Sequence, residues 1–284
     1  MTLHLATVAD STNLVLIKHF IDWYCPRVDR MHFTLQGSDP QPAIDLLKQE
    51  GIEPAFLWQG EYHTFGLREY RDRMRKECVP NDEWCLTVDC DEFQNWHPKE
   101  VLRDEYNLVP GIMVDMVAEN GILTKMLEKP SLLEQYPNKC FITQKIGQSW
   151  IAKIAAMKGH DLEVWGEGGG YTYINPKCET RVLPMIVETF HFKWDDKVKQ
   201  RMEQRAESYQ SLKIGWHHLS TNLANYFDDH DRIQIDACAD CQYDSISPEI
   251  LKKQYGDMYD GTKTLSELRS CYCSIPRDSS GVCM

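Results

Sequence analysis

The sequence predicts an α/β fold in which helices flank a mixed, mainly parallel sheet, followed by a mostly helical C-terminal extension. Two observations predict this fold. Short apolar runs alternate with amphipathic helical patterns through the first half of the chain, as they do in βαβ units. Residues 84–88 form an almost continuous apolar run, which is typical of a central parallel strand buried on both faces. The 284 residues are enough for one such domain and an appendage.

The expected elements of the first half follow one another in order. Strands are predicted at residues 3–8, 30–36, 52–58 and 84–88, separated by helices at residues 14–24, 43–49 and 67–78. The last of these helices carries five basic side chains: Arg68, Arg71, Arg73, Arg75 and Lys76. Because acidic residues are interleaved with them, we expect these side chains to form the solvent-exposed face of an amphipathic helix.

The second half of the chain is less regular. We expect strands at residues 111–117 and 185–194, a helix at 149–158, a glycine-broken loop at 164–173 and a helix from residue 195 onward. The remainder is polar and cysteine-bearing, with weak periodicity. We therefore predict a first domain of residues 1–195 and a helical, cysteine-containing extension of residues 196–284.

Composition and charge exclude several classes of function. A net charge of −12 argues against a broad nucleic-acid-binding surface. No run approaches the roughly 20 apolar residues of a transmembrane helix. A strand is expected almost at the first residue, so no signal peptide is expected before it. Eleven cysteines, an odd number, favour free thiols in a reducing cytoplasm over a disulfide scaffold. A cytoplasmic enzyme acting at the inner face of a membrane would also be compatible.

The buried run at residues 84–88 leads directly into three carboxylates, Asp89, Asp91 and Glu92. Ligands of open α/β sheets bind at the carboxyl ends of the strands. Strand alternation would place Asp89 and Asp91 on the same side, where they repel each other unless a cation lies between them. A divalent cation that also binds substrate phosphates would supply this charge. The alternative is an acidic turn that is merely solvated.

A second candidate element is the alternating strand that ends at residues 188–194. Its three aromatic side chains share one face, and Thr189, His191 and Lys193 share the other. His191 is a candidate metal ligand, and the Lys193 ammonium is a candidate partner for a diphosphate. The alternative is an edge strand with a solvent-facing polar side.

Two carboxylates compete for the role of general base. Glu167 lies in the glycine-rich stretch 166–170, which lacks the Lys-Ser/Thr of a phosphate-binding loop and fits a mobile loop that closes over substrate. Asp115 lies in a strand predicted to be buried, and burial raises the pKa of a carboxyl group toward neutrality. The choice between them stays open at this point.

The cysteines of the tail offer one further alternative. Cys238 and Cys241 have the spacing of a zinc knuckle, whereas Cys271 and Cys273 are separated by only one residue, which is atypical. Reduced cysteines are the expectation, with a structural zinc ion as the alternative.

Taken in order, these features resemble a glycosyltransferase of the GT-A fold, in the broad family-2-like group. The resemblance rests on a strand leading to the polar turn at residues 7–10, a strand ending in Gln-Gly-Ser-Asp at 36–39, the Asp-x-Asp-Glu-Phe block at 89–93 and the His-Phe-Lys-Trp element at 191–194. It covers roughly residues 1–210. It implies a GT-A-like, Rossmann-like first domain that binds a nucleotide sugar and carries the catalytic site.

The resemblance also implies roles for individual residues. Asp89 would contact the ribose or the metal, and Asp91 would ligate the Mn²⁺ or Mg²⁺ that bridges the donor diphosphate. His191 would complete the metal site, and Asp10 and Asp39 would lie around the base and ribose. Relatives often carry an Asn-Glu pair where this chain has Asp10, which is a departure from the family pattern at the nucleotide contact.

The function predicted from this resemblance is metal-dependent transfer of a sugar from a nucleotide-sugar donor to an acceptor hydroxyl, with inversion. A UDP-sugar is expected from its frequency in the family, and the acceptor is a glycan, a lipid-linked sugar or a small alcohol. Two alternatives belong to other classes. One is a phosphatase of the haloacid-dehalogenase type, whose strand also ends in Asp-x-Asp; the other is a non-catalytic module that binds sugars or nucleotides.

Overall fold

The computed structural model describes residues 1–148, 152–160, 162–165, 173–176, 181–183, 185–211 and 217–238. These residues form two compact units. The first comprises residues 1–112 and 152–189, and the second comprises residues 113–148 and 190–238. The domain boundary expected at residue 195 stays a prediction. No helix in the described part of the chain is long and apolar enough to cross a membrane.

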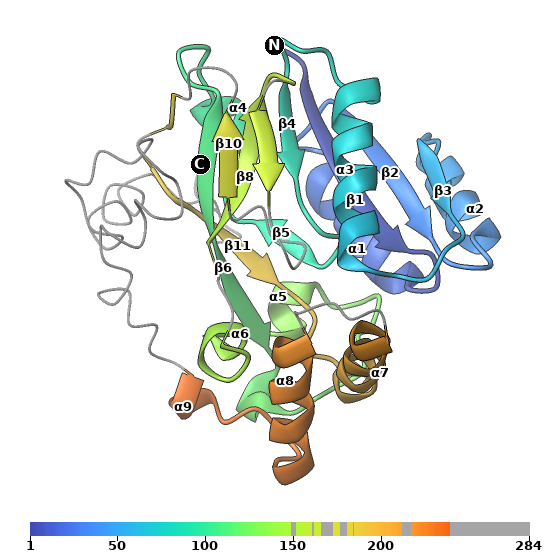
Figure 1. Ribbon diagram of the computed structural model, residues 1–284, viewed down its shortest axis with the longest axis vertical. Helices are drawn as coiled ribbons and strands as arrows, with labels where there is room; N and C mark the ends of the chain where they lie inside the picture. Colours follow the sequence, from blue (N-terminus) through green and yellow to red (C-terminus); the bar gives the residue numbers. More distant parts are fainter. Residues whose placement is uncertain are drawn as a thin grey trace. The chain divides into compact units, whose positions relative to one another are not determined.

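The first unit is built on a mixed sheet with a parallel half (Figure 1). The parallel half contains, in spatial order, β3 (Phe56–Trp58), β2 (Arg30–Gln36), β1 (Leu3–Asp10) and β4 (Trp84–Thr87). Beyond β4 the sheet continues with β8 (Ala152–Lys158), β6 (Leu108–Val117), β11 (Val187–His191) and β5 (Glu92–Gln94). Strand β8 is antiparallel to both β4 and β6. This architecture confirms the predicted mixed, mainly parallel sheet.

Helices cover both faces of the parallel half. Helix α3 (Thr64–Cys78) packs Leu67 and Met74 against Ala6 and Val8 of β1. Because side chains alternate along a strand, their neighbours Thr7 and Ala9 face the opposite side. Helix α1 (Leu14–Tyr24) lies on that side, with helix α2 (Gln41–Gln49) beside it. The Phe20 ring of α1 packs edge-on against Phe33 of β2, 5.8 Å between centroids.

The second unit has its own hydrophobic core. Its described elements are the remainder of β6, β7 (Asn138–Cys140), the short helices α5 (Leu132–Gln135), α6 (Ile142–Lys145) and α9 (Ile235–Cys238), and the longer helices α7 (Val198–Ser211) and α8 (His217–Asp229). Trp194 lies in this core with Ile142, Met202, Leu223 and Phe227. Helices α7, α8 and α9 lie in the part of the chain that was expected to be mostly helical, and residues 239–284 lie outside the described residues.

One predicted helix is wrong. Residues 149–158 were expected to be helical, but residues 152–158 form β8, between β4 and β6. Ala156 pairs with Leu86 on one side and with Val109 on the other. Ala, Met and Lys favour helices, but the hydrogen bonds of two neighbouring strands and the burial of residues 154–157 outweigh that preference.

On both sides of the glycine-rich stretch, the structure contains β-strands, at residues where a loop was expected. Residues at both ends of the interval 164–173 belong to a hairpin, because β9 (Leu162–Trp165) pairs antiparallel with β10 (Tyr173–Pro176). The stretch 166–172, which includes Glu167, lies outside the described residues.

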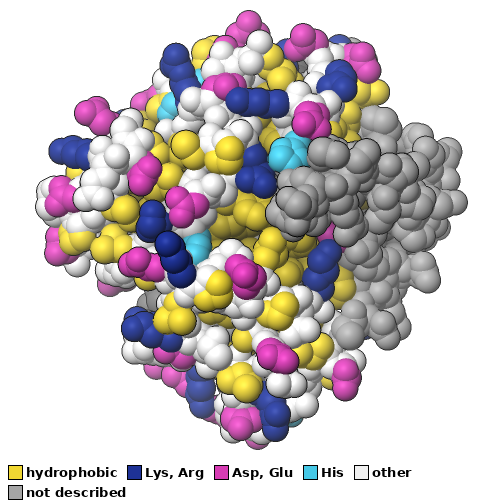
Figure 2. All heavy atoms as spheres, turned by 180° about the vertical axis from the view of Figure 1, so that it is seen from behind, with side chains coloured by type: hydrophobic (Ala, Val, Ile, Leu, Met, Phe, Trp, Pro, Cys, Tyr) yellow, Lys and Arg dark blue, Asp and Glu magenta, His cyan; other side chains and the backbone are white. Residues whose placement is uncertain are grey.

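The expected solvent-exposed face of α3 is also partly wrong. Arg71 and Arg75 are each only 2% exposed. They follow Leu67 by four and eight positions, so they lie on the helix face that packs against the sheet. Acidic and basic side chains elsewhere are interspersed on the face shown in Figure 2.

At the amino ends of β1 and β2, two histidines pair. His4 Nδ1 lies 2.9 Å from His32 Nε2, and the other nitrogen of the fully buried His4 contacts Glu83. Burial, the charge on His4 and the charge on Arg30 lower the pKa of His32 to about 4. The folded protein therefore favours a neutral His32 ring at pH values where an unfolded chain would already bind a proton.

This pair predicts a loss of stability in mild acid. As the pH falls from about 6.5 to about 4, the unfolded chain gains a proton at His32 that the folded chain does not bind, so the free energy of unfolding decreases. We expect a loss on the order of 1 kcal/mol, because the partly exposed ring is screened by solvent. Urea unfolding of wild type and His32→Gln at pH 7 and pH 4.5 measures it. An equal acid-induced loss in both proteins would contradict the assignment to His32.

A glycine in the second unit provides a stability test. Gly121 has φ +71°, and a Cβ there would lie 1.9 Å from the Ile233 carbonyl oxygen. Gly51 of the first unit has φ +72°, but a Cβ there would meet nothing within 4 Å. We expect Gly121→Ala to lower the free energy of unfolding by about 3 kcal/mol and Gly51→Ala by about 1 kcal/mol. Urea unfolding compares them, and equal losses would show that the second unit absorbs the close contact.

Candidate functional site

The first candidate site lies at the carboxyl edge of the parallel strands. Strand β1 lies between β2 and β4. The chain runs outward from β1 through β2 to β3 and then crosses back to β4 on the other side of β1. This arrangement creates a topological switch point, where ligands of open α/β sheets bind. Asp10 ends β1, and the segment that contains Asp89 and Asp91 directly follows β4. The predicted acidic block therefore lies at the edge of the sheet where a ligand is expected.

The three acidic residues form a turn and do not continue the strand. Strand β4 ends at Thr87, and the Glu92 amide donates a hydrogen bond to the Asp89 carbonyl, 2.9 Å. The Asp89 amide in turn donates to Glu92 Oε2, 3.1 Å. The alternation expected for Asp89 and Asp91 does not apply to this turn. Glu92, only 2% exposed, begins β5.

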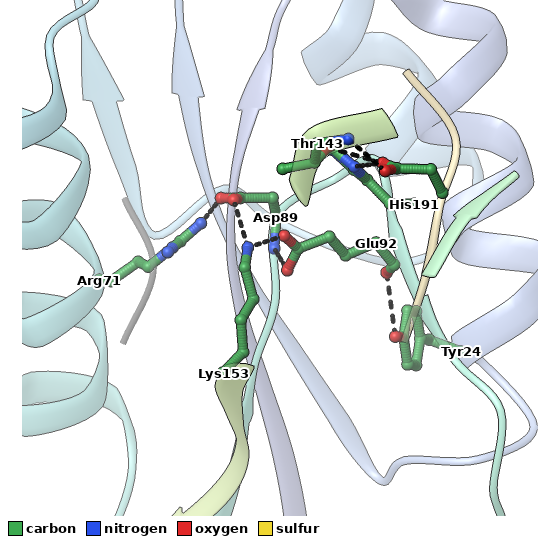
Figure 3. Close-up of polar contacts among 8 residues, drawn as sticks. Tyr24, Arg71, Asp89, Glu92, Thr143, Lys153 and His191 are labelled. Atoms are coloured by element: carbon green, nitrogen blue, oxygen red, sulfur yellow. Dashed lines mark hydrogen bonds and ion pairs between the residues drawn. The ribbon is translucent and has the colours of Figure 1, made fainter. Parts of the chain in front are cut away.

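Two cationic side chains contact this turn. Arg71 of α3 pairs with the Asp89 carboxylate, and Lys153 of β8 contacts Glu92, as Figure 3 shows. Lys153 Nζ also lies 3.5 Å from Asp89 Oδ2. The acidic turn is therefore not simply solvated, and the protein itself supplies positive charge that the sequence led us to expect from a metal ion.

The charges in this cluster shift one another's ionisation. Burial and the nearby Arg71 charge lower the pKa of Lys153 to about 7, while the charge on Asp91 opposes this shift. Burial raises the pKa of the Cys90 thiol well above its usual value, and the charges on Asp91 and Asp10 raise it further. Because β1 and β4 are parallel neighbours, Asp10 at the end of β1 and Asp91 after β4 lie at the same edge of the sheet.

Asp10 is the last residue of β1 and Asp39 follows β2, and both are exposed. Asp10 Oδ1 accepts hydrogen bonds from the Thr12 amide, 2.9 Å, and from the Thr12 hydroxyl, 2.8 Å. The Ser11 amide donates to the Gln36 carbonyl, 2.8 Å, and the Ser11 hydroxyl donates to the Asp39 carbonyl, 3.4 Å. These bonds tie the two segments together.

A second group of polar side chains lies within the second unit. Asp115 of β6 is only 1% exposed, and its carboxylate receives hydrogen bonds from Thr143, His191 and Trp194. Figure 3 shows the contacts of Thr143 and His191. The solvent-facing polar side considered for residues 189–193 is therefore wrong: Thr189, His191 and Lys193 are 2%, 6% and 9% exposed.

The remaining predicted residues are placed as follows. Lys193 lies beyond the end of β11, with Nζ 4.9 Å from the centre of the Trp194 ring. Glu167, Cys241, Cys271 and Cys273 lie outside the described residues, and Cys238 is buried as a free thiol.

The sequence patterns placed Glu92 in the acidic block without giving it a role of its own, and they did not indicate that Arg71 and Lys153 contact this block. The burial of Arg71 could have been predicted from the sequence. Arg71 follows Leu67 by four residues and precedes Met74 by three, so it lies on the apolar face of the helix. No comparable signal marked Lys153, because its place in the sheet depends on the pairing of β8 with β4 and β6.

Comparison with known proteins identifies no family. No protein-family model and no curated protein matches the chain. Among solved structures, it is similar to a 4-diphosphocytidyl-2C-methyl-D-erythritol synthase (12% identity, 56% of this chain and 75% of that one, TM-score 0.32). It is also similar to a putative glucose-1-phosphate thymidylyltransferase from Bacillus anthracis (10%, 57% and 72%, 0.32) and to S. aureus TarS 1–349 (12%, 87% and 74%, 0.32).

The charge cluster predicts a difference between two lysines of the same strand. Lys153→Met removes the partner of the buried Glu92, whereas Lys158→Met removes only a pair with Asp104, which is 81% exposed. We expect the first change to lower the free energy of unfolding by about 3 kcal/mol and the second by at most about 0.5 kcal/mol. Urea unfolding at pH 6, below the pKa of Lys153, measures both.

A companion variant isolates the electrostatic cause. In Lys153→Met/Glu92→Gln, the buried acceptor no longer carries a charge, so we expect part of the lost stability to return. Equal stability of Lys153→Met and Lys158→Met would show that the contact between Lys153 and Glu92 contributes nothing.

Proposed function

We propose that the protein is a metal-dependent glycosyltransferase that moves a sugar from a nucleotide-sugar donor to an acceptor hydroxyl. The observation that carries this proposal is the acidic turn after β4, at the topological switch point of the parallel strands and at the same edge of the sheet as Asp10. The resemblance of the block at residues 89–93 and of the element at 191–194 to family-2-like enzymes supports it. The donor class, a UDP-sugar, rests on family frequency.

For the donor, we assign the nucleoside to the turns that contain Asp10 and Asp39. Asp89, which already pairs with Arg71 and Lys153, is better suited to a ribose hydroxyl than to a metal ion. We keep Lys193 as the candidate partner of the diphosphate, because an ammonium neutralises phosphate as a point charge. Binding of the metal ion remains the alternative role of Asp89.

For the metal, the resemblance implies Asp91 and His191 as ligands, and we keep both in this proposal. A carboxylate oxygen suits hard cations such as Mg²⁺ or Mn²⁺, and Mn²⁺ also accepts an imidazole nitrogen. The negative charge of Asp91 acts on both Cys90 and Lys153, as the pKa shifts of these groups indicate. A bound divalent ion would neutralise the charge that develops on the departing diphosphate.

For the acceptor, a carboxylate base would remove the hydroxyl proton as the oxygen attacks C1 of the sugar. The nucleoside diphosphate leaves in the same displacement, which inverts the anomeric centre. Asp115 already accepts four hydrogen bonds, so its lone pairs are largely committed. This favours Glu167 over Asp115 as the base.

The acceptor itself is proposed only by class: a glycan, a lipid-linked sugar or a small alcohol. A cytoplasmic site of action, including the inner face of a membrane, stays part of this proposal.

A thermal-shift screen with UDP, GDP, CMP and dTDP, each with and without Mn²⁺, tests the proposal. A ligand at 100 times its Kd stabilises the folded state by about 2.7 kcal/mol, or roughly 5 °C for a chain of this size. We expect one nucleotide to raise the melting temperature, and only when Mn²⁺ is present. Asp91→Ala should abolish the shift, while Asp104→Ala, which changes an exposed carboxylate, should keep it.

Turnover then separates the classes of protein. Release of the nucleoside diphosphate from a nucleotide sugar, dependent on Mn²⁺ and on Asp91, supports a transferase. Nucleotide binding without turnover would indicate a binding module, and a covalent aspartyl-phosphate would indicate a phosphatase. A full metal-dependent shift in Asp91→Ala would contradict the metal assignment.

A further inference from the structure

The carboxylate of Asp115 is almost completely buried. Asp115 lies on β6, in the second unit, beside the core that contains Val117, Cys140 and Trp194. A carboxylate in such surroundings costs several kcal/mol unless donors compensate for the lost water. The positions of the donors that surround Asp115 therefore indicate the role of its side chain.

Four donors converge on this carboxylate. The Thr143 amide donates to Oδ2 at 2.7 Å, and the Thr143 hydroxyl donates to Oδ1 at 2.8 Å. Trp194 Nε1 donates to Oδ1 at 3.0 Å, and His191 Nδ1 lies 2.8 Å from the same oxygen. The contacts with Thr143 at the start of α6 and with Trp194 hold the carboxylate in place independently of His191. Asp115 is thus a fixed acceptor for the imidazole.

A fixed carboxylate determines which imidazole nitrogen carries the proton. An ionised carboxylate only accepts hydrogen bonds, so Nδ1 of His191 must be the donor. In the neutral ring the lone pair then lies on Nε2, the nitrogen that can bind a cation. Histidines that ligate metals commonly donate their other ring N–H to a carboxylate, which fixes the tautomer and the orientation of the ring.

We propose that Asp115 is a positioning residue that holds the His191 imidazole in the tautomer protonated at Nδ1, leaving Nε2 to bind the divalent cation. The assignment of the cation rests on the proposed function, whereas the tautomer does not. Asp115 acts through His191 and does not touch the reacting atoms. This role accounts for a buried carboxylate whose oxygens are occupied by donors from Thr143, His191 and Trp194.

Nitrogen NMR of histidine-labelled protein at pH 8.5 tests the tautomer directly. Two-bond ¹H–¹⁵N correlations distinguish an Nδ1–H ring from an Nε2–H ring, and the spectrum of His191→Gln identifies the His191 signals. We expect the wild type to show the Nδ1–H tautomer. An Nε2–H tautomer in the wild type would overturn the inference, whatever the metal affinity is.

Asp115→Asn tests the cause. Its amide NH₂ would face one of the donors that surround the carboxylate, so we expect His191 to populate both tautomers in this variant. Thr143→Val is the matched control, because it removes one donor to Asp115 but leaves the bond between Asp115 and His191. An unchanged tautomer in a folded Asp115→Asn protein would overturn the inference, while a mixture in that variant alone supports it.

Calorimetric titration with Mn²⁺ alone separates this inference from the proposed function. We expect Asp115→Asn to weaken Mn²⁺ binding about 10- to 100-fold, and less than about 2-fold further in a His191→Gln background. An equally large loss in both backgrounds would overturn the action through His191. An Nδ1–H ring that needs Asp115, in a protein that binds no Mn²⁺, would uphold the positioning role and refute the proposed metal site.

Discussion

The arrangement of the first unit depends on the compensation of buried charge where β4 ends. Glu92 is only 2% exposed and Arg71 is equally buried, and neither charge would be tolerated there alone. Arg71 comes from α3, Lys153 from β8, and both carboxylates from the turn between β4 and β5. The cluster therefore links a helix, an antiparallel strand and the acidic turn through charge, in addition to the apolar packing beneath them.

This compensation bears directly on the proposed chemistry. A turn whose carboxylates repelled one another would need a cation simply to fold. Here, Arg71 and Lys153 provide that positive charge, so the proposed divalent cation would not be required for the structure of the turn. The pKa of Lys153, lowered to about 7, reflects the competition between burial and Arg71 on one side and Asp91 on the other.

The second unit meets the same constraint with neutral donors. Asp115 is compensated by an amide, a hydroxyl, an indole and an imidazole, so its charge needs no cationic partner of fixed charge. Hydrogen bonds to an ionised acceptor are stronger than those between neutral groups, and a complete set keeps a buried carboxylate rigid. In both units, the polar residues of interest are held by partners that lie far away in the sequence.

The sequence by itself determined the elements that depend on local periodicity. The strands at 3–8, 30–36 and 84–88, the helices between them and the position of the acidic block directly after a buried strand all follow from apolar spacing and turn residues. Only the tertiary structure decided which side chains meet. Lys153 contacts Glu92 across 61 residues, and Asp115 contacts His191 across 76. The same pairing turned residues 152–158 into a strand and Arg71 into a buried partner, because the free energy of these contacts outweighs the local preferences from which sequence patterns are interpreted.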